Sequence, residues 1–320
     1  MSEVTAVAAP QNHDEPAVRP FPLPGYSITV GPFSHLRAER ERLSALRWRH
    51  FDAEQVGATL GAEISGIDLT VAQPAEVVDE LRRALHDYKV LFLRDQPLTP
   101  AQHVAFARSF GELEIHPALA ASADQPELVR FEKDSQMVGV ENAWHHDVTW
   151  RERPSLGAVL HAVEVPPIGG DTLFADMYAA YESLDADTRA EIDGLDAIHD
   201  FTRAFGFRAT PEQQAEMRER NPSVRHPVVA THAATGRKHL YVNRIFTDRI
   251  VGYDEDRGRA LIDRLARQAD YPEHQVRLTW RPDTVAFWDN RAVQHYAASD
   301  YWPQRRVVER ASITGPRPTR

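Results

Sequence analysis

The segment from Ala143 to Trp150 reads Ala-Trp-His-His-Asp-Val-Thr-Trp and carries residues suited to metal chemistry. His145 and Asp147 are two positions apart, so in an extended chain both side chains point to the same side. An imidazole and a carboxylate on one side form half of a divalent-metal site. A second imidazole would complete a facial triad of two histidines and one carboxylate, which leaves coordination positions open on Fe(II). His146 is the weaker candidate ligand, because it faces away from Asp147 in an extended chain.

The second imidazole is expected from His295, which follows the β-prone run Val285–Trp288 and a polar turn. Such a turn would bring His295 to the start of a new strand, far along the chain from His145. A His-x-Asp triplet alone is a common pattern, and the chain holds another at 50–52, in a charged and helix-prone stretch. The triplet at His145 is preferred because its context favours a strand.

Two arginines that follow His295 are candidates for binding anions. Side chains along a strand alternate between its two faces. We therefore expect one face to carry Arg306, Val308 and Arg310, and the other to carry Arg305, Val307 and Glu309. Arginines turned into a pocket need anions, and a guanidinium matches a carboxylate through two parallel hydrogen bonds. Two inward arginines therefore predict two bound anionic groups. The alternative is surface ion pairing with neighbours such as Glu309 or Asp300.

A fold rich in strands must position these residues. The runs that we expect as strands are Lys89–Arg94, Gly157–Val165, Asp171–Phe174, His226–Val229, His239–Val242, Val276–Trp280, Val285–Trp288 and Arg306–Ile313. Helices are expected at Pro74–Tyr88, between the N-cap Thr99 and Gly111, and at about Asp185–Leu195, Pro211–Arg220 and Asp256–Ala269. Many short strands without an internal repeat favour a mainly β fold with peripheral helices, an antiparallel barrel or jelly roll. A doubly wound sheet is disfavoured, because regular strand–helix alternation and a phosphate loop are missing.

The composition is that of a globular protein with an acidic balance. Of 320 residues, 42% are apolar and 26% charged, which allows a sizeable core. The net charge of −10 argues against nucleic acid as a partner, which would need a basic stripe. The absence of cysteine excludes disulfides, thiolate zinc sites, iron–sulfur clusters and cysteine nucleophiles. No apolar run approaches the length of a membrane span, so we expect a soluble, cytoplasmic protein, and self-association into a homo-oligomer stays open.

The first fifty residues are expected to lie outside the main domain. Residues 1–24 hold five prolines among small and charged residues, which is typical of an extended or disordered arm. They lack the charged and apolar regions of a secretory signal. We therefore divide the chain into an N-terminal arm, residues 1–50, and one domain, residues 51–320.

Ordered blocks of sequence from Gly61 to the C-terminus resemble the TauD/TfdA family of Fe(II)- and 2-oxoglutarate-dependent dioxygenases. The blocks are Gly61–Leu69, Phe110–Pro117, Trp144–Thr149, Gly169–Phe174, His226–Val229, Trp288–His295 and Asp300–Arg306. The resemblance implies a double-stranded β-helix, the cupin-like form of the jelly roll, in agreement with the strand-rich pattern.

The resemblance also implies roles for the site residues. His145, Asp147 and His295 would bind the iron as the catalytic centre, and Arg306 with the hydroxyl of Thr172 would hold the carboxylate of 2-oxoglutarate. The family uses O2 to oxidise a small anionic molecule and converts 2-oxoglutarate to succinate and CO2. The metal is then a redox centre, distinct from its Lewis-acid role in hydrolases.

Taurine-type members of the family bind a sulfonate through a histidine, an arginine and a backbone amide. The matching positions here are His116, Arg310 and Val148. Phe205 and Phe246 match the aromatic walls around the carbon chain. The resemblance therefore implies a small sulfonate that releases sulfite when it is oxidised.

The end of the pocket that holds the amine of taurine departs from the family pattern. Leu119, Glu141 and Ala204 stand where Tyr, Asn and Ser are expected. Leu119 and Ala204 favour a more apolar or longer tail, whereas an inward Glu141 would pair with an amine. The sequence leaves both substrates open.

Two other functions are compatible with the motifs. Within the same family the chain would be an alkylsulfatase or a phenoxyalkanoate dioxygenase, which release sulfate or a phenol. Outside it, a cupin-like metal hydrolase or isomerase would use the triad without 2-oxoglutarate and would not need Arg306 and Thr172. Residues 118–137, with their small and polar side chains, are expected to form a lid over the pocket.

Overall fold

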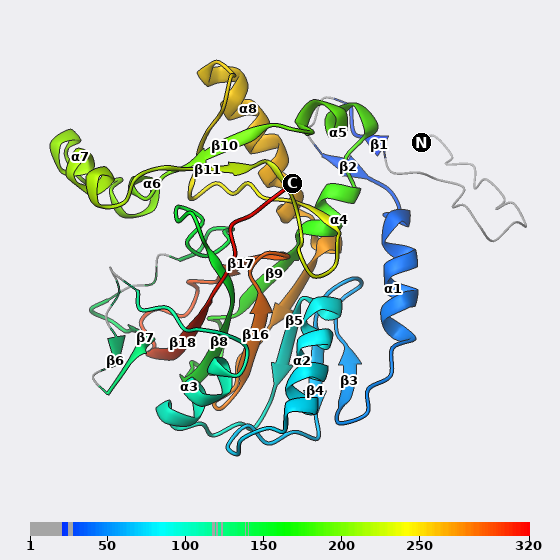
Figure 1. The fold of residues 1–320 in the computed structure, drawn as a ribbon, viewed down its shortest axis with the longest axis vertical. Coiled ribbons are helices and arrows are strands. Elements are labelled where there is room, and N and C mark those ends of the chain that lie inside the picture. Colours follow the sequence, from blue (N-terminus) through cyan, green and yellow to red (C-terminus); the bar gives the residue numbers. More distant parts are fainter. Residues whose placement is uncertain are drawn as a thin grey trace, which may run out of the picture.

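The computed structural model describes residues 21–24, 28–116, 119, 121–122, 124–137, 139 and 141–320, and two β-sheets form its centre (Figure 1). The larger sheet has eight strands in the order β3 (Asp52–Gln55), β4 (Ala62–Ser65), β5 (Val90–Leu93), β16 (Val285–Asp289), β8 (Ser155–Glu164), β18 (Arg306–Thr314), β7 (Gln125–Lys133) and β6 (Ala121–Ser122). The smaller sheet has three, in the order β15 (Gln275–Leu278), β9 (Thr172–Asp176) and β17 (Val293–Ala297). Apart from β4 and β5, neighbouring strands of both sheets pair antiparallel. The mainly β jelly roll predicted from the sequence is confirmed.

The core of the jelly roll lies between the two sheets and takes side chains from both. Phe92 and Trp288 of the larger sheet pack with Phe174 and Leu278 of the smaller one. The rings of Phe92 and Phe174 have centroids 5.9 Å apart. This packing holds β9 and β17 at a fixed distance from β8 and β18, so residues on the facing sides of these strands can share one cavity.

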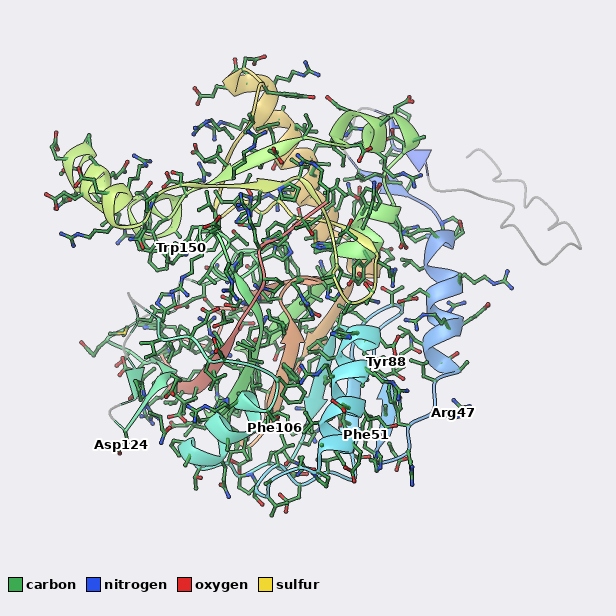
Figure 2. All side chains as sticks on the ribbon, in the orientation of Figure 1. Arg47, Phe51, Tyr88, Phe106, Asp124 and Trp150 are labelled. Atoms are coloured by element: carbon green, nitrogen blue, oxygen red, sulfur yellow. The ribbon has the colours of Figure 1, made fainter. Side chains whose placement is uncertain are left out.

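Helices α2 (Ala75–Tyr88) and α3 (Pro100–Arg108) cover the outer face of the larger sheet (Figure 1). The buried face of α2 includes the residues that the sequence predicts: Val77, Leu81, Leu85 and Tyr88. Tyr88 and Phe106, labelled in Figure 2, belong to one apolar cluster with Phe287 of β16. Burying each such side chain contributes about 1.5–3 kcal/mol, so the apolar spacing of α2 is enough to determine which face docks.

A capping box closes the N-terminus of α3, where the sequence predicts Thr99 as the N-cap. The amide of Gln102 donates to the Thr99 hydroxyl at 3.3 Å, and the amide of Thr99 donates to the Gln102 side chain at 2.8 Å. Replacing Thr99 by alanine should therefore lower the free energy of unfolding by about 1 kcal/mol, as measured by urea denaturation. Thr210→Ala is the matched control, because α7 (Pro211–Arg220) has the same capping box but buries no residue. Because α7 buries no residue, Thr210→Ala should lower the free energy of unfolding less than Thr99→Ala does. Equal losses in the two variants would mean that the cost of losing the cap does not depend on docking of the helix.

Further helices and small sheets surround the jelly roll. The helices are α1 (Arg37–Ser44), α4 (Met177–Glu182), α5 (Ala186–Ile192), α6 (Thr202–Phe205) and α8 (Glu255–Ala266), and α8 continues into a 3₁₀ turn, Arg267–Asp270. The strands form the sheets β11 (Val224–Pro227), β10 (Asp196–His199) and β14 (Thr247–Ile250); β12 (Val229–Thr231) and β13 (Lys238–Leu240); and β1 (Phe21–Pro22) and β2 (Thr29–Val30). Figure 1 shows α7 extending away from the sheets, with α6 at its base. Among the described residues, no helix is both long and apolar enough to cross a membrane.

The described part of the segment expected as an N-terminal arm packs onto the domain. Helix α1 buries Leu43 and carries Glu39, whose carboxylate pairs with Lys89 Nζ at 2.9 Å and with Arg237 at 2.7 Å. Lys89 is fully buried and also lies 3.2 Å from Asp176. Residues 1–20 lie outside the described residues, so an extended arm there, and the division of the chain at residue 50, stay predictions.

Two other expectations differ from the structure. Residues 118–137 were expected as a lid, but their longest described part is the regular strand β7, which pairs with β18 from Arg306–Lys133 to Ala311–Leu128; Ala118, Ala120 and Ala123 lie outside the described residues. The single strand expected at His226–Val229 is divided, because β11 pairs with β10 and β12 pairs with β13. A short strand pattern does not reveal such a change of partner.

Candidate metal and cosubstrate site

A single β-bridge brings the predicted metal ligands together. His145 and His295 face each other, and the amide of each donates to the carbonyl of the other, at 3.1 and 2.9 Å. Oδ1 of Asp147 lies 3.8 Å from Nε2 of His145, and Oδ2 of Asp147 lies 3.9 Å from Nε2 of His295. The ligand atoms of all three residues lie within 4.8 Å of one another. Side chains about 150 residues apart in sequence therefore converge on one point, as the sequence predicts.

Neighbouring groups fix the orientation of these ligands. Nδ1 of His145 lies 2.8 Å from the carbonyl of Ala143, so this nitrogen carries the proton and Nε2 presents its lone pair. The Asn290 side chain accepts a hydrogen bond from the amide of Asp147 at 2.7 Å and donates to its carbonyl at 3.1 Å. Burial, followed by the effect of His145, lowers the pKa of His295 to about 3, so this imidazole is neutral. Two imidazoles and one carboxylate fit a divalent iron site.

Arg310 contacts the same carboxylate. Its Nη1 lies 2.9 Å from both oxygens of Asp147, while its Nε is buried without a hydrogen-bond partner among the described residues. Burial alone would raise the pKa of Asp147, but the Arg310 guanidinium and then the two histidines keep it below its ordinary value. Burial, then Arg310, lowers the pKa of His116 to about 4. A neutral histidine and a partly satisfied guanidinium thus lie beside the ligand cluster, as expected for the predicted anion clamp.

Val148 has an unusual backbone conformation directly after the metal-binding carboxylate. Its φ is +48°, which is rare for a β-branched residue. Such a conformation costs of order 1–3 kcal/mol and is often found where function demands it. The side chain is buried and lines the same cavity as Arg310. The strained turn belongs to the site, which agrees with the predicted use of the Val148 amide.

Arg306 is a buried cation whose charge is not balanced by a nearby carboxylate. It is 7% exposed, its Nε has no hydrogen-bond partner, and no ion pair joins it to a carboxylate within the described part of the chain. Burial lowers its pKa. Its guanidinium lies 5.9 Å from the ring centroids of Trp280 and Tyr301, and Trp280 Nε1 donates to the Thr172 hydroxyl at 2.9 Å. A buried guanidinium of this kind predicts an anionic ligand.

Gly170 allows this packing around Arg306. Its φ is +71°, and a Cβ there would lie 3.1 Å from Cδ of Arg306 and 3.2 Å from the Tyr301 ring. A side chain at this position would therefore press against the guanidinium stem. The Gly169-Gly170 pair, noted in the sequence before β9, leaves room for Arg306 to lie against the small sheet.

One cavity of about 500 Å³ contains every predicted site residue. It is lined by His145, Asp147, His295, Thr172, Arg306, His116, Val148, Arg310, Phe205, Phe246, Leu119, Glu141 and Ala204. The strand alternation predicted for residues 305–310 holds as well: Arg306, Val308 and Arg310 line the cavity, while Arg305 pairs with Glu132 at 2.6 Å on the opposite face. The structure thus brings these residues together, and their individual roles stay predictions.

The end of the cavity expected to bind the substrate tail combines apolar side chains with a charged pair. The Glu141 carboxylate contacts Lys133 Nζ at 2.9 Å, and both residues line the cavity. Phe205 is 38% exposed, so it lies at the rim, whereas Phe246 is buried. Several other lining residues were not predicted from the sequence, namely Phe131, Lys133, Leu160, Arg203, Phe207, Ile245, Trp288 and Tyr301. The strand pattern of β7 was the signal for Phe131, which lies opposite Val308 of β18.

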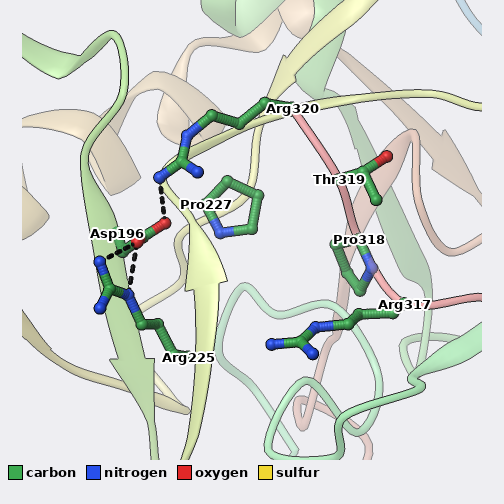
Figure 3. Close-up of a pocket in the computed structure, with 7 residues that line it drawn as sticks. All are labelled: Asp196, Arg225, Pro227, Arg317, Pro318, Thr319 and Arg320. Atoms are coloured by element: carbon green, nitrogen blue, oxygen red, sulfur yellow. Dashed lines mark hydrogen bonds and ion pairs between the residues drawn. The ribbon is translucent and has the colours of Figure 1, made fainter.

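A second hollow, of about 270 Å³, lies near the C-terminus and away from these residues. Its charged groups are paired: the Asp196 carboxylate binds both Arg225 and Arg320 (Figure 3), and Arg317 pairs with Glu152 at 2.8 Å. This pairing leaves little charge for a ligand, so the large cavity is the candidate site.

Comparison with known proteins agrees with the geometry. A sequence model of the taurine catabolism dioxygenase TauD, TfdA family matches residues 52–312. An alkylsulfatase of Acinetobacter baylyi is 36% identical over 264 residues, which cover 80% of this chain and 82% of that protein. An alpha-ketoglutarate-dependent sulfate ester dioxygenase of Pseudomonas putida is 33% identical over 274 residues, covering 82% and 89%. The crystal structure of a taurine dioxygenase from Burkholderia xenovorans has a TM-score of 0.73 at 35% identity, covering 84% of this chain and 93% of that one.

Proposed function

The chain belongs to the TauD, TfdA family of dioxygenases, and we propose that it oxidises an organic sulfonate or sulfate ester with an apolar tail, using Fe(II). As a member of this family it is a 2-oxoglutarate-dependent dioxygenase that consumes O2. The iron would be held by His145, Asp147 and His295, whose two imidazoles and one carboxylate suit it. When bound, the iron supplies the redox chemistry that couples oxidation of the substrate to conversion of 2-oxoglutarate to succinate and CO2.

The residues of the chain bind and orient the two organic acids. Arg306, with the Thr172 hydroxyl beside it, takes a carboxylate of 2-oxoglutarate, because its buried guanidinium lacks an internal carboxylate partner among the described residues. Arg310 and His116 take the anionic head of the substrate, assisted by the backbone amide of Val148, and all three residues line the cavity. The apolar walls exclude water from the bond that is oxidised.

The observation that carries the substrate assignment is the number of apolar side chains that line the cavity around its cationic groups. Arg310 and His116 lie near Asp147, and the lining also includes Leu119, Phe131, Phe207 and Ile245, with the Phe131 ring 5.1 Å from the Arg310 guanidinium. The Glu141 carboxylate, which would be needed to recognise an amine, already contacts Lys133. We therefore favour an alkyl chain over the aminoethyl group of taurine. The 36% sequence identity to an alkylsulfatase also supports an alkyl chain as the tail of the substrate.

Hydroxylation of the carbon that bears the head group explains the products. A hydroxyl on the carbon next to a sulfate ester oxygen gives an unstable intermediate, whose C–O bond breaks to leave an aldehyde and sulfate. The same step on an alkyl sulfonate breaks the C–S bond and leaves an aldehyde and sulfite. An aryloxy acid would release a phenol, so the leaving group identifies the substrate class.

The proposal is tested by a panel of acids incubated with Fe(II), 2-oxoglutarate and O2. Hexyl sulfate, hexanesulfonate, taurine and phenoxyacetate are compared by formation of succinate together with sulfate, sulfite or phenol. Each methylene buried against the apolar walls should lower the KM by about fourfold, which corresponds to about 0.8 kcal/mol. Ethyl, butyl and hexyl sulfate should therefore form a rising series in kcat/KM. Preference for taurine, or turnover of aryloxy acids alone, would overturn the assignment.

Replacing Arg310 by alanine should raise the KM of the best organosulfur substrate by about ten- to a hundredfold, the range expected for a hydrogen bond to a charged group. Slow formation of succinate without substrate should persist, because Arg306 still binds 2-oxoglutarate. Steady-state kinetics with and without substrate measure both quantities, and metal content checks that Asp147 remains a ligand after losing its partner. Equal loss of both activities would mean that Arg310 does not act mainly on the substrate.

A further inference from the structure

A second cluster of metal-ligating side chains lies on the other face of the strand that carries Arg306 and Arg310. It consists of His103 from α3, His161 from β8 and Glu309 from β18, all buried. Their ligand atoms lie within 4.8 Å of one another. Glu309 and His161 are direct cross-strand partners, which places their side chains next to each other on one face of the sheet. Helix α3 lies over this face and adds His103.

The hydrogen bonds around His103 leave one of its ring nitrogens available as a metal ligand. Its Nε2 lies 2.9 Å from the carbonyl of Val159, so Nε2 carries the proton. Its Nδ1 then presents a lone pair, and this buried atom has no hydrogen-bond partner among the described residues. Histidines that bind metals usually donate their other nitrogen to a carbonyl or carboxylate in this way. The ring is therefore oriented as a ligand would be.

His161 is also a buried imidazole with unused nitrogen atoms. Neither of its ring nitrogens makes a well-formed hydrogen bond within the described part of the chain, and the nearest carboxylate oxygen, on Asp283, is 3.4 Å from Nε2. Burial lowers the pKa of His161, against the opposing effect of Asp283, and burial lowers the pKa of His103 to about 4. Both imidazoles are thus neutral near pH 7, the form that binds metals.

The carboxylate of Glu309 completes the set and is held in place from the side. Arg130 Nη1 donates to Glu309 Oε1 at 2.8 Å, as an outer partner that orients the carboxylate. The Asp283 side chain is 45% exposed, so it connects the cluster to solvent and offers an oxygen as a fourth donor. Two nitrogen donors and one or two oxygen donors suit a divalent transition ion such as Zn(II), whereas Mg(II) and Ca(II) prefer oxygen.

We propose that His103, His161 and Glu309 bind a divalent transition-metal ion of the zinc type, which fastens α3 to the back of the larger sheet. The site is separate from the cavity, because Glu309 points to the opposite face of β18 from Arg306 and Arg310. The three ligands are buried beneath α3 and lie outside the cavity, so the site has a structural role. It supports the strand whose other face binds the organic acids.

The experiment uses the full chain with His145→Ala and His295→Ala, which removes the first ligand set and makes the result independent of the oxidation chemistry. Co(II) titration should give one bound equivalent with visible d–d bands, and Zn(II) should displace it. Zn(II) should also raise the Tm by several degrees. Glu309→Gln, which keeps the shape of the side chain, should weaken Co(II) binding at least tenfold, and His161→Phe should abolish both the bands and the Tm shift.

His274→Phe is the matched control, because His274 is a buried histidine with an unpartnered Nε2 but lies outside the cluster. It should retain the full equivalent of Co(II). Circular dichroism shows whether each variant is folded. The proposal would be overturned if the folded His145→Ala, His295→Ala protein bound no Co(II), which would leave a cluster held by internal contacts alone. It would also be overturned if Co(II) binding survived both His161→Phe and Glu309→Gln.

Discussion

The variant His295→Ala should lose more than about 100-fold in affinity for Fe(II) at the catalytic site, since even outer partners of metal ligands contribute 10–100-fold. Only His145 and Asp147 would remain as ligands, and Asp147 would then be held mainly by Arg310. Formation of succinate, with or without substrate, should fall to background. Metal content after anaerobic Fe(II) titration measures the first effect, and succinate release measures the second. Both are measured in the His161→Phe background, which keeps the second proposed site from contributing metal.

His146→Phe is the comparison that tests the choice of ligands. His146 is adjacent in sequence and fully buried, and its ring lies 4.9 Å from that of Tyr241, on the side away from the cavity. This variant should keep its Fe(II) as long as it remains folded. If a folded His146→Phe protein lost metal as completely as His295→Ala, the ligand set would need to be redrawn around His146.

The sequence predicts best those features that depend on local spacing. His145 and Asp147 are two positions apart and do share a side, and alternation along β18 correctly places Arg306 and Arg310 together. The capping box at Thr99 and the apolar face of α2 are equally local. In each case the backbone geometry that positions the side chains is set by residues within one turn or one strand.

The features that the sequence does not predict depend on which elements meet. Lys133 reaches Glu141 because β7 joins the sheet as a strand. The lid expected there is therefore wrong in its main part, and the Glu141 carboxylate has a cationic partner within the chain. His103 reaches Glu309 only because α3 crosses β18. A buried histidine on a helix face has no pattern that distinguishes it from a core residue, and the docking of α3 decides what it contacts.

Replacing Arg306 by alanine should raise the 2-oxoglutarate concentration needed for half-maximal rate by tens- to thousands-fold, equivalent to about 2–5 kcal/mol for a buried charge-assisted pair. The reason is that this guanidinium is buried against Trp280 and Tyr301 without an ion pair to any described carboxylate, so its charge is balanced only when an anion binds. Metal affinity should change little, because no ligand atom is removed. Fe(II) and 2-oxoglutarate titrations without O2, read from the visible absorption of their complex, separate the two effects.

Arg305→Ala is the matched control on the neighbouring position of the same strand. Arg305 is 41% exposed and pairs with Glu132 and Glu164 at the surface, where such pairs contribute about 0–1 kcal/mol. Its loss should leave the 2-oxoglutarate requirement unchanged within about twofold. A similar rise of the 2-oxoglutarate requirement in both variants would mean that β18 is disturbed as a whole. A metal-dependent activity of Arg306→Ala that needs no 2-oxoglutarate would instead favour a hydrolase that uses the same three ligands.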